Sequence, residues 1–262
     1  MSGALQASGI DKRFGGVQAL EGAAVSVEPG RITGLIGRNG SGKTTLFNCI
    51  TGFIVPDGGK VTLDGVDLTG ARPEAVVAAG LSRTFQTPRE DARTSVRHAV
   101  RCGCYVQSKA GILGAIAGLP GALREERRIG VLADGLIERF GLWAQRDAPL
   151  GTLSMGLVRL VEVARAMATG ARYLLLDEPA AGLSADEQQI LSAQIRAVAH
   201  SGVGVLLVEH NFSLVRSMCD TITVLDFGKV LSTGGPDQIA RDPKVVQAYL
   251  GAVAQDTVQA RP

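Results

Sequence analysis

The segment Gly37-Arg38-Asn39-Gly40-Ser41-Gly42-Lys43-Thr44-Thr45 carries residue types at a spacing that suits phosphate binding. It matches the pattern G-x-x-x-x-G-K-[ST], whose glycines allow a tight turn that aims backbone N–H groups inward. Those amides can hold the β- and γ-phosphates of a nucleotide at the start of the following helix. Lys43 supplies a point charge, and the hydroxyl of Thr44 suits Mg²⁺. The alternative is a flexible glycine-rich turn, so the flanking sequence must decide.

Two adjacent acids, Asp177 and Glu178, form a second candidate element. They follow Tyr173-Leu174-Leu175-Leu176, an apolar run typical of a strand that is buried on both faces of a parallel sheet. Ligands of open α/β sheets bind at the carboxyl ends of such strands. There Asp177 can hold Mg²⁺, directly or through water, and Glu178, which points the other way, can take a proton from an attacking water. By itself the acidic pair could also be a solvated turn.

A third candidate is Leu153-Ser154-Met155-Gly156, which precedes a predicted helix over residues 157–167. A serine at a helix N-terminus with a nearby glycine can bind an anion, but a simple N-cap explains the pattern equally well. His210 follows the apolar residues 205–208 and Glu209. Taken alone, it is by default an exposed or satisfied histidine.

Strand and helix patterns place these candidates in an α/β fold. Strand-like runs over residues 5–10, 23–27 and 32–36, separated by glycine-containing turns, predict an antiparallel layer that leads into the phosphate loop. A helix begins at Thr44, so the loop lies in the strand–loop–helix context that phosphate binding requires. Asp64-Gly65 predicts a tight hairpin turn. Further predicted strands cover residues 60–63, 81–85, 173–176, 203–208, 221–225 and 229–231, and further helices cover residues 73–79, 125–140, 185–199 and 211–218.

The β signals largely vanish between residues 87 and 168, which predicts a helical insertion in the α/β core. We therefore expect a single domain over residues 1–254, with a core of residues 1–87 and 169–254, a helical subdomain of residues 88–168 and a tail of residues 255–262. Ser184-Ala185-Asp186-Glu187 is a capping box that sets the start of the helix after the acidic pair.

Composition limits the class of protein. With 262 residues, 45% of them apolar, the chain can bury a large core, and a net charge of +2 gives no global field for nucleic acid. The spacing of the four cysteines fits neither a disulfide framework nor a zinc site, so we expect reduced thiols in a reducing compartment. The N-terminus lacks a signal-peptide pattern, and the most apolar window, residues 110–123, is too short to span a bilayer.

In chain order, these elements resemble the nucleotide-binding subunit of ATP-binding-cassette transporters, from about residue 4 to residue 251. Residues 37–45 look like the Walker A loop, residues 153–157 the family signature and residues 173–178 the Walker B strand. Gln86 looks like the Q-loop glutamine and His210 the switch histidine. The resemblance implies a phosphate-loop NTPase (RecA-like) core with an antiparallel β layer and an inserted helical subdomain.

The family resemblance also implies a head-to-tail dimer with two ATP molecules between the subunits. Ser154 and Gly156 would bind the γ-phosphate in trans. The implied catalytic residues are Glu178, which polarises the lytic water, His210, which contacts the γ-phosphate, and Lys43; the implied Mg²⁺ ligands are Thr44, Gln86 and Asp177. The implied nucleotide-binding residues are Phe14, which would stack on adenine, Gly37, Asn39, Gly40, Ser41, Gly42, Lys43, Thr44, Thr45 and Gln86.

Four short segments of the sequence resemble those of the branched-chain amino acid importer ATPases. They are Arg83-Thr84-Phe85-Gln86, Asp177-Glu178-Pro179-Ala180-Ala181-Gly182-Leu183, Val208-Glu209-His210-Asn211 and Ala248-Tyr249-Leu250-Gly251. This implies a peripheral ATPase subunit on the cytoplasmic face of the membrane that powers uptake of a small solute, namely a branched-chain or other amino acid or an amide-like compound. The implied partners are two transmembrane permease subunits, a second ATPase subunit of the same or a related sequence and, indirectly, an extracytoplasmic solute-binding protein, with no nucleic acid.

The sequence departs from the family pattern in two places. Met155 replaces the first glycine of the signature and Leu157 its usual glutamine, while residues 89–100 are more charged than usual in a region that faces the membrane partner in relatives. An ATPase that drives export or lipid transport remains the alternative, because it shares every catalytic residue. In a small-molecule kinase with the same loop, Gln86, the signature and His210 would have no role.

Overall fold

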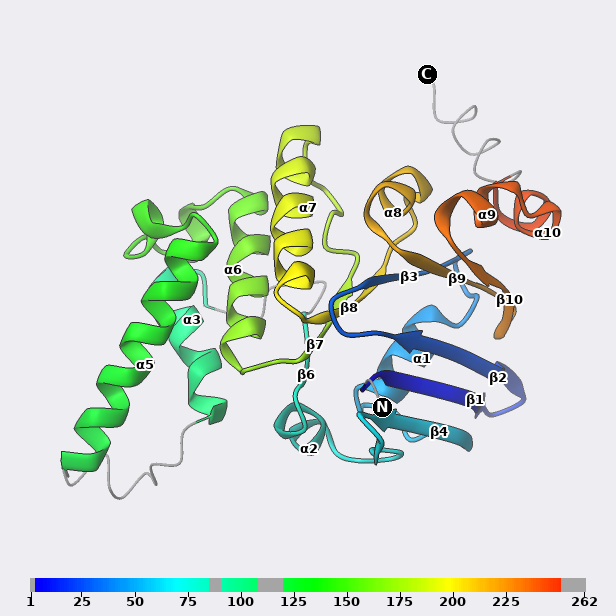
Figure 1. Ribbon diagram of the computed structural model, residues 1–262, viewed down its shortest axis with the longest axis horizontal. Coiled ribbons are helices and arrows are strands. Elements are labelled where there is room, and N and C mark those ends of the chain that lie inside the picture. Colours follow the sequence, from blue (N-terminus) through cyan, green and yellow to red (C-terminus); the bar gives the residue numbers. More distant parts are fainter. Residues whose placement is uncertain (1–2, 85–90, 108–119, 251–262) are drawn as a thin grey trace.

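A computed structural model describes residues 3–84, 91–107 and 120–250, and Figure 1 shows their arrangement. The strands form a four-stranded sheet in the order β2-β1-β4-β5 and a six-stranded sheet in the order β10-β9-β3-β8-β7-β6. The helices α3, α5 and α6 gather at one end of the molecule, away from strands β1, β2 and β4. The predicted combination of an α/β core, an antiparallel layer and a helical region is therefore present.

The four-stranded sheet is antiparallel throughout. Register shifts interrupt the pairing of β1 with β2, which bends and twists this ribbon. Asp64 and Gly65 have φ angles of 49° and 83°, which the tight turn between β4 and β5 requires. The sequence prediction of a hairpin at this dipeptide is confirmed. The strands are β1 (Leu5–Phe14), β2 (Val17–Val27), β4 (Gly58–Leu63) and β5 (Val66–Asp67).

The six-stranded sheet is parallel except for its edge strand β10, which pairs antiparallel with β9. The prediction that residues 32–36 belong to the antiparallel layer is wrong, because this strand pairs in parallel with β8 and β9. Every residue of that strand is buried, and a parallel sheet covered on both faces provides such burial. The strands are β3 (Ile32–Gly37), β6 (Leu81–Arg83), β7 (Tyr173–Asp177), β8 (Gly204–Val208), β9 (Thr221–Asp226) and β10 (Lys229–Gly234).

Alternate residues of the central strands point into two different hydrophobic clusters. Leu174 and Leu176 of β7 join the cluster that also contains residues of α6, α7 and α8, whereas Leu175 joins the cluster beneath α1 and the antiparallel sheet. This alternation follows from the period of two in a β-strand. The covering helices are α1 (Lys43–Ile50), α2 (Pro73–Ala78), α7 (Ala185–His200) and α8 (Phe212–Met218); α9 (Pro236–Arg241), α10 (Pro243–Val245) and a π-helical turn, η4 (Val246–Leu250), follow β10.

Helices and the turns that connect them make up the described part of residues 88–168, with an isolated β-bridge between Ser95 and Pro149. Buried apolar residues hold them together: Ala99 and Val100 of α3 lie in one cluster with Ile129, Ala133 and Ile137 of α5. Burial of such side chains stabilises a fold by roughly 25 cal/mol per Å² of apolar surface. The helices are α3 (Val96–Cys104), α5 (Pro120–Arg139) and α6 (Met155–Ala168), with 3₁₀ turns η1 (Tyr105–Gln107), η2 (Trp143–Gln145) and η3 (Leu150–Thr152).

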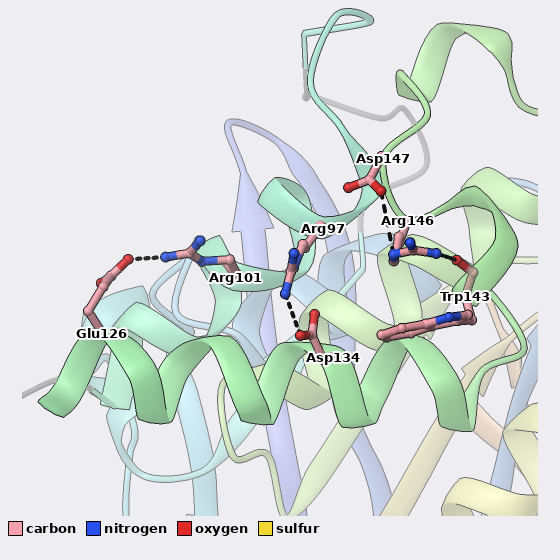
Figure 2. A network of polar contacts seen from close by, with 7 residues as sticks. All are labelled: Arg97, Arg101, Glu126, Asp134, Trp143, Arg146 and Asp147. Atoms are coloured by element: carbon pink, nitrogen blue, oxygen red, sulfur yellow. Dashed lines mark hydrogen bonds and ion pairs between the residues drawn. The ribbon is translucent and has the colours of Figure 1, made fainter. Parts of the chain in front are cut away.

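Ion pairs join the same helices on the surface. Figure 2 shows Arg97 and Arg101 of α3 reaching Asp134 and Glu126 of α5, respectively. Arg146 stacks on the ring of Trp143, 4.5 Å from its centroid, and donates a hydrogen bond of 2.9 Å to its backbone carbonyl. The two pairs between α3 and α5 are partly exposed, and surface ion pairs are worth about 0–1 kcal/mol each.

The described helices also contain a buried ion pair. Arg159 and Glu162, one turn apart on α6, are joined by a hydrogen bond of 2.9 Å from Nη1 to Oε2. Neither side chain is more than a tenth exposed. Loss of either partner would leave an uncompensated buried charge. We therefore expect this pair to affect the stability of the fold, although it lies at a distance from the sheet edge.

Candidate functional site

The phosphate loop connects the carboxyl end of β3 to the start of α1. Gly42, the N-cap residue of α1, has φ 101°, and a Cβ atom at this position would lie 2.7 Å from the carbonyl oxygen of Ala19. Only glycine fits such a conformation and such a close approach. The first turn of α1 has no side-chain cap and no acidic residue, so its N–H groups and the positive end of the helix dipole are available to an anion.

Lys43 is the first residue of α1, and its side chain reaches back to the start of this loop. Its Nζ donates hydrogen bonds of 2.7 Å and 2.9 Å to the backbone carbonyls of Gly37 and Arg38, and the residue is 7% exposed. Burial lowers the pKa of Lys43, while the nearby carboxylates of Glu178 and Asp177 act in the opposite direction. The ammonium group therefore lies among the carbonyls of a loop whose amides can bind phosphate.

Ser41 offers a further polar atom in the same loop. Its Oγ is buried and has no hydrogen-bond partner among the described residues. A buried polar group without a partner costs free energy, and an oxygen of a bound phosphate would satisfy it. The loop, the helix start and this hydroxyl together fit a nucleotide phosphate.

The two acids lie at the carboxyl edge of the same sheet. Asp177, the last residue of β7, is level with Val208 of β8, which in turn is level with Leu35 of β3. Asp177 is buried, and burial raises its pKa, opposed in part by Arg83 and Lys43. The pairing register thus places the end of β7 at the same sheet edge as the phosphate loop, with β8 between them, as the sequence predicted for ligands of a parallel sheet.

Glu178 begins the loop after β7 in a left-handed conformation, with φ 47°. Its backbone N–H donates a hydrogen bond of 2.9 Å to Val208, and its side chain is 27% exposed. A glutamate in this conformation is strained, and such strain persists only where surrounding contacts impose it. The Glu178 side chain is thus partly exposed, whereas Asp177 before it is buried.

The structure brings His210 next to Glu178. The Nδ1 atom of His210 lies 3.8 Å from Oε1 of Glu178 and 4.0 Å from Oε2 of Glu209. The imidazole is 60% exposed, so solvent reaches it at this edge of the sheet. A carboxylate and an imidazole at this separation can act on the same water or phosphate oxygen.

Glu209 is a residue whose position sequence reasoning did not single out. It is 1% exposed, and its Oε1 accepts a hydrogen bond of 3.1 Å from the backbone N–H of Ala180. Burial raises the pKa of Glu209, opposed by the hydrogen bonds from Ala180 and His210. The signal available in the sequence was an acid directly after a strand of apolar residues. A buried charge at such a position is energetically unfavourable unless it has a partner.

Ser154 and Gly156 lie at the start of α6. The Oγ of Ser154 caps the helix by accepting from the N–H of Leu157 at 3.4 Å, and the N–H of Gly156 donates to Oε1 of Glu187 at 3.1 Å. Glu187 also forms the predicted capping box with Ser184. Hydrogen bonds from Ser184, Ser154 and Gly156 hold the pKa of Glu187 below its usual range. The described partners of this candidate phosphate-binding segment thus lie on α6 and α7.

The remaining candidate residues lie at the rim of the loop. Phe14 ends β1 and is 48% exposed, and Nζ of Lys12 lies over its ring, 5.6 Å from the centroid. Asn39, Gly40 and Thr44 are exposed, and Thr45 is partly buried. Gln86 lies outside the described residues.

A phosphate loop at the carboxyl edge of a parallel sheet, with two acids at the same edge where the next strand but one ends, defines a phosphate-loop nucleotide-binding protein. Residues 20–181 match the family model described as ABC transporter, and residues 229–255 match the model described as Branched-chain amino acid ATP-binding cassette transporter. The chain belongs to the ATP-binding-cassette transporter family, whose members are ATPases. The sequence-based recognition of this family is confirmed.

Curated relatives place the chain within one branch of the family. It is 38% identical over 248 residues to the high-affinity branched-chain amino acid transport ATP-binding protein BraF of Pseudomonas aeruginosa, covering 94% of this chain and 97% of BraF. It is 36% identical, with the same coverage, to LivG of Escherichia coli, which carries the same description.

A solved structure has the same architecture. The ADP conformation of an ATP-binding cassette of an ABC transporter matches with a TM-score of 0.82 and 30% identity, covering 96% of this chain and 99% of that one. The predicted phosphate-loop NTPase fold is therefore confirmed. No helix in the described part of this chain is both long and apolar enough to cross a membrane.

Proposed function

We propose that this chain is the ATP-hydrolysing subunit of an importer that takes up a small solute, a branched-chain or other amino acid or an amide-like compound. The proposal rests on one observation above all: Glu178 and His210 meet 3.8 Å apart beside the buried Lys43 of a phosphate loop. Kinship with BraF and LivG supports the choice of solute class.

Nucleotide binding is the first step of the proposed cycle. Lys43 turns from its own loop carbonyls to the β- and γ-phosphates, and the amides of residues 37–45 together with Ser41 Oγ surround them. Phe14 stacks on the adenine ring. Asn39, Gly40, Gly42 and Thr45 shape the loop around the phosphates.

Magnesium fits the donors at this edge of the sheet. The hydroxyl of Thr44 and the carboxylate of Asp177 are oxygen ligands of the kind that Mg²⁺ prefers, and Gln86 would add a side-chain carbonyl. When bound, the ion neutralises charge that develops on the phosphate oxygens.

Hydrolysis is assigned to Glu178 and His210. Glu178 accepts a proton from a water whose oxygen attacks the γ-phosphorus, and the bond from that phosphorus to the bridging oxygen breaks, giving ADP and inorganic phosphate. The exposed edge of the His210 imidazole contacts the γ-phosphate. The 3.8 Å separation of the two side chains allows both to act on one reacting group.

A second subunit completes each site in the proposed assembly. Ser154 and Gly156 of one subunit bind the γ-phosphate of the ATP held by the other, which explains a second phosphate-binding segment in one chain. Met155 is exposed at the start of α6, and Leu157 packs partly against the core, so neither supplies the polar group of the usual signature. Pairing with a related ATPase would tolerate this weakened site.

Membrane partners are part of the proposal. The core of residues 1–87 and 169–254 binds nucleotide, and the helical subdomain of residues 88–168 faces two transmembrane permeases from the cytoplasmic side. An extracytoplasmic binding protein delivers the solute. Because the ATPase does not contact the solute, those partners determine which solute is transported.

The experiment that tests this function is affinity purification of the tagged chain at its native level from detergent-solubilised membranes, with retained proteins identified by mass spectrometry. We expect two permeases and an ATPase partner, and the reconstituted complex should accumulate amino acid in vesicles only with Mg-ATP. A Lys43→Met chain is the matched control, since it should retain the permeases and lose uptake. Recovery of an exporter channel instead would overturn the importer assignment and leave the ATPase chemistry intact.

A further inference from the structure

One buried carboxylate connects the two loops that carry Glu178 and His210. Glu209 lies directly after β8, and its side chain reaches the loop after β7. Its Oε1 accepts the hydrogen bond of 3.1 Å from Ala180 N–H, and the carboxylate also accepts a hydrogen bond from the backbone N–H of His210. Backbone donors from both loops therefore end on a single side chain.

The loop after β7 needs such an anchor. Glu178 has the strained φ of 47°, and a non-glycine residue keeps that conformation only when its neighbours are fixed. On one side its N–H is bound to Val208, and two residues further on Ala180 is bound to Glu209. The contact with Ala180 thus fixes the backbone two residues after Glu178. Because the backbone on both sides of Glu178 is then held, the position from which its side chain extends is held as well.

Glu209 also lies beside the imidazole of His210. Its Oε2 is 4.0 Å from Nδ1, on the same nitrogen that faces Glu178 at 3.8 Å. The Nδ1 edge of the ring is therefore flanked by both carboxylates. A carboxylate beside a histidine can fix the orientation of its ring, as it does in metal sites.

We propose that Glu209 is a positioning residue for ATP hydrolysis, which holds Glu178 and His210 in one fixed relationship through their backbones. The proposal rests on the proposed roles of those two residues and deepens them. Glu209 does not act on nucleotide itself. A position next to the apolar β8 strand at 1% exposure would otherwise favour an apolar side chain, because burial of a carboxylate is unfavourable unless specific donors compensate it.

Substitution of Glu209 tests this role through the rate and the affinity separately. In the full-length chain, Glu209→Leu removes both acceptors at similar volume, and we expect kcat for Mg-ATP to fall by about 10- to 100-fold, the usual effect of a misplaced reacting group. Glu209→Gln keeps one carbonyl acceptor, and its kcat should lie between those of Glu209→Leu and the parent. The dissociation constant for ATP should stay within about twofold in both variants, because Glu209 does not contact the phosphate loop.

A control and a double variant separate positioning from general destabilisation. Glu162→Gln neutralises another buried carboxylate, the partner of Arg159 on α6, and should lower the unfolding midpoint with little change in kcat. In a Glu178→Gln background, Glu209→Gln should add less than about a twofold further loss, because residues that act through one another are not additive.

Three outcomes would overturn the proposal: unchanged kcat in both Glu209 variants, equal losses of kcat and ATP affinity, or full additivity with Glu178→Gln. If Glu209→Leu does not fold, the Glu209→Gln variant and its double with Glu178→Gln decide alone. If the proposed ATPase role of Glu178 were wrong, the result would differ, because Glu178→Gln itself would then retain turnover. Loss of turnover in Glu178→Gln with full activity in both Glu209 variants would reject only the role of Glu209.

Discussion

The ammonium group of Lys43 donates a hydrogen bond of 2.7 Å to the carbonyl oxygen of Gly37, which lies at the other end of the same loop. The loop thereby holds its own cation in the space between its amides. Nucleotide must compete with these carbonyls for Lys43, so the contribution of the lysine to ATP affinity is the difference between two sets of charged hydrogen bonds.

We predict that Lys43→Met weakens ATP binding by about 10- to 100-fold, since a hydrogen bond to a charged group contributes about 1.5–3 kcal/mol. Fluorescent nucleotide titration measures this. Lys229→Met removes an exposed lysine that pairs with Glu21 and should leave the affinity unchanged. Equal affinities for the parent and Lys43→Met would contradict the assignment of the loop.

Glu178→Gln should retain ATP and lose turnover by about 10²- to 10⁴-fold, the usual contribution of a positioned base. The variant should also accumulate as a dimer in Mg-ATP, because the closed pair cannot clear its γ-phosphates. Light scattering with and without Mg-ATP tests this directly. Glu138→Gln, on the exposed side of α5, is the control; a Glu178→Gln chain that stays monomeric in Mg-ATP would count against a sandwiched nucleotide.

Arg83 should not tolerate lysine. Its guanidinium carbon lies 4.5 Å and 4.8 Å from the ring centroids of Phe47 and Phe53, and Nη1 donates to Asn48 Oδ1 at 2.8 Å and Thr51 Oγ1 at 3.1 Å. Because an ammonium group cannot reproduce this planar, stacked geometry, Arg83→Lys should lower the free energy of unfolding by about 1–2 kcal/mol.

Urea denaturation measures the effect of Arg83→Lys. Arg124→Lys, an exposed change on α5, should leave the midpoint where it is. Identical midpoints for the two variants would mean that the aromatic sandwich around Arg83 contributes nothing to stability.

Tyr173→Phe should destabilise the fold by about 1 kcal/mol, because the buried hydroxyl donates a hydrogen bond of 2.7 Å to Asp64 Oδ1. Burial, aided by Asp64, raises the pKa of Tyr173 above its ordinary value of 10. This stabilisation is present below pH 10 and is lost as the pH rises further, because the unfolded tyrosine then releases its proton first. Unfolding scans at pH 8 and pH 11 should therefore show a steeper alkaline loss for the parent than for Tyr173→Phe.

Thiol labelling should distinguish the four cysteines. Burial raises the pKa of Cys49 to about 11 and that of Cys219 to about 12, and it also raises the pKa of Cys104, whereas Cys102 is exposed. Since the thiolate is the reactive form, a disulfide reagent at pH 8 should modify one thiol in the native chain and all four in denaturant. Cys102→Ser should abolish the native reaction, and rapid labelling of a second thiol would show that a buried cysteine is accessible.

The sequence predicted the positions of most strands and helices because periodicity and turn chemistry are local. Asp64-Gly65 could be located because few dipeptides adopt two positive φ angles. The extension of β1 to Phe14 was missed, since residues 11–14 are polar or exposed and owe their strand conformation to pairing with β2. The sheet to which β3 belongs was also missed, because strand pairing depends on residues far along the chain.

Candidate site residues were predictable where a motif fixes residue type and spacing, as in the phosphate loop and the acidic pair. The contacts of Glu209 and Glu187 were not. Each carboxylate bonds to the backbone N–H of a distant loop or helix, Ala180 in one case and Gly156 in the other. Every residue except proline has a backbone N–H, so residue type does not indicate which of them donates to a carboxylate. These contacts are therefore visible only in the structure.

The order of strands in the parallel sheet has a consequence for biosynthesis. β3 lies between β8 and β9, whose residues follow it by most of the length of the chain. During translation, β3 therefore leaves the ribosome long before either neighbour exists, and the backbone N–H and C=O groups on both of its edges stay unpaired until β8 and β9 follow. Such non-local pairing is slow to form. Nucleotide can thus assist only the last stage of folding, when the chain is nearly complete.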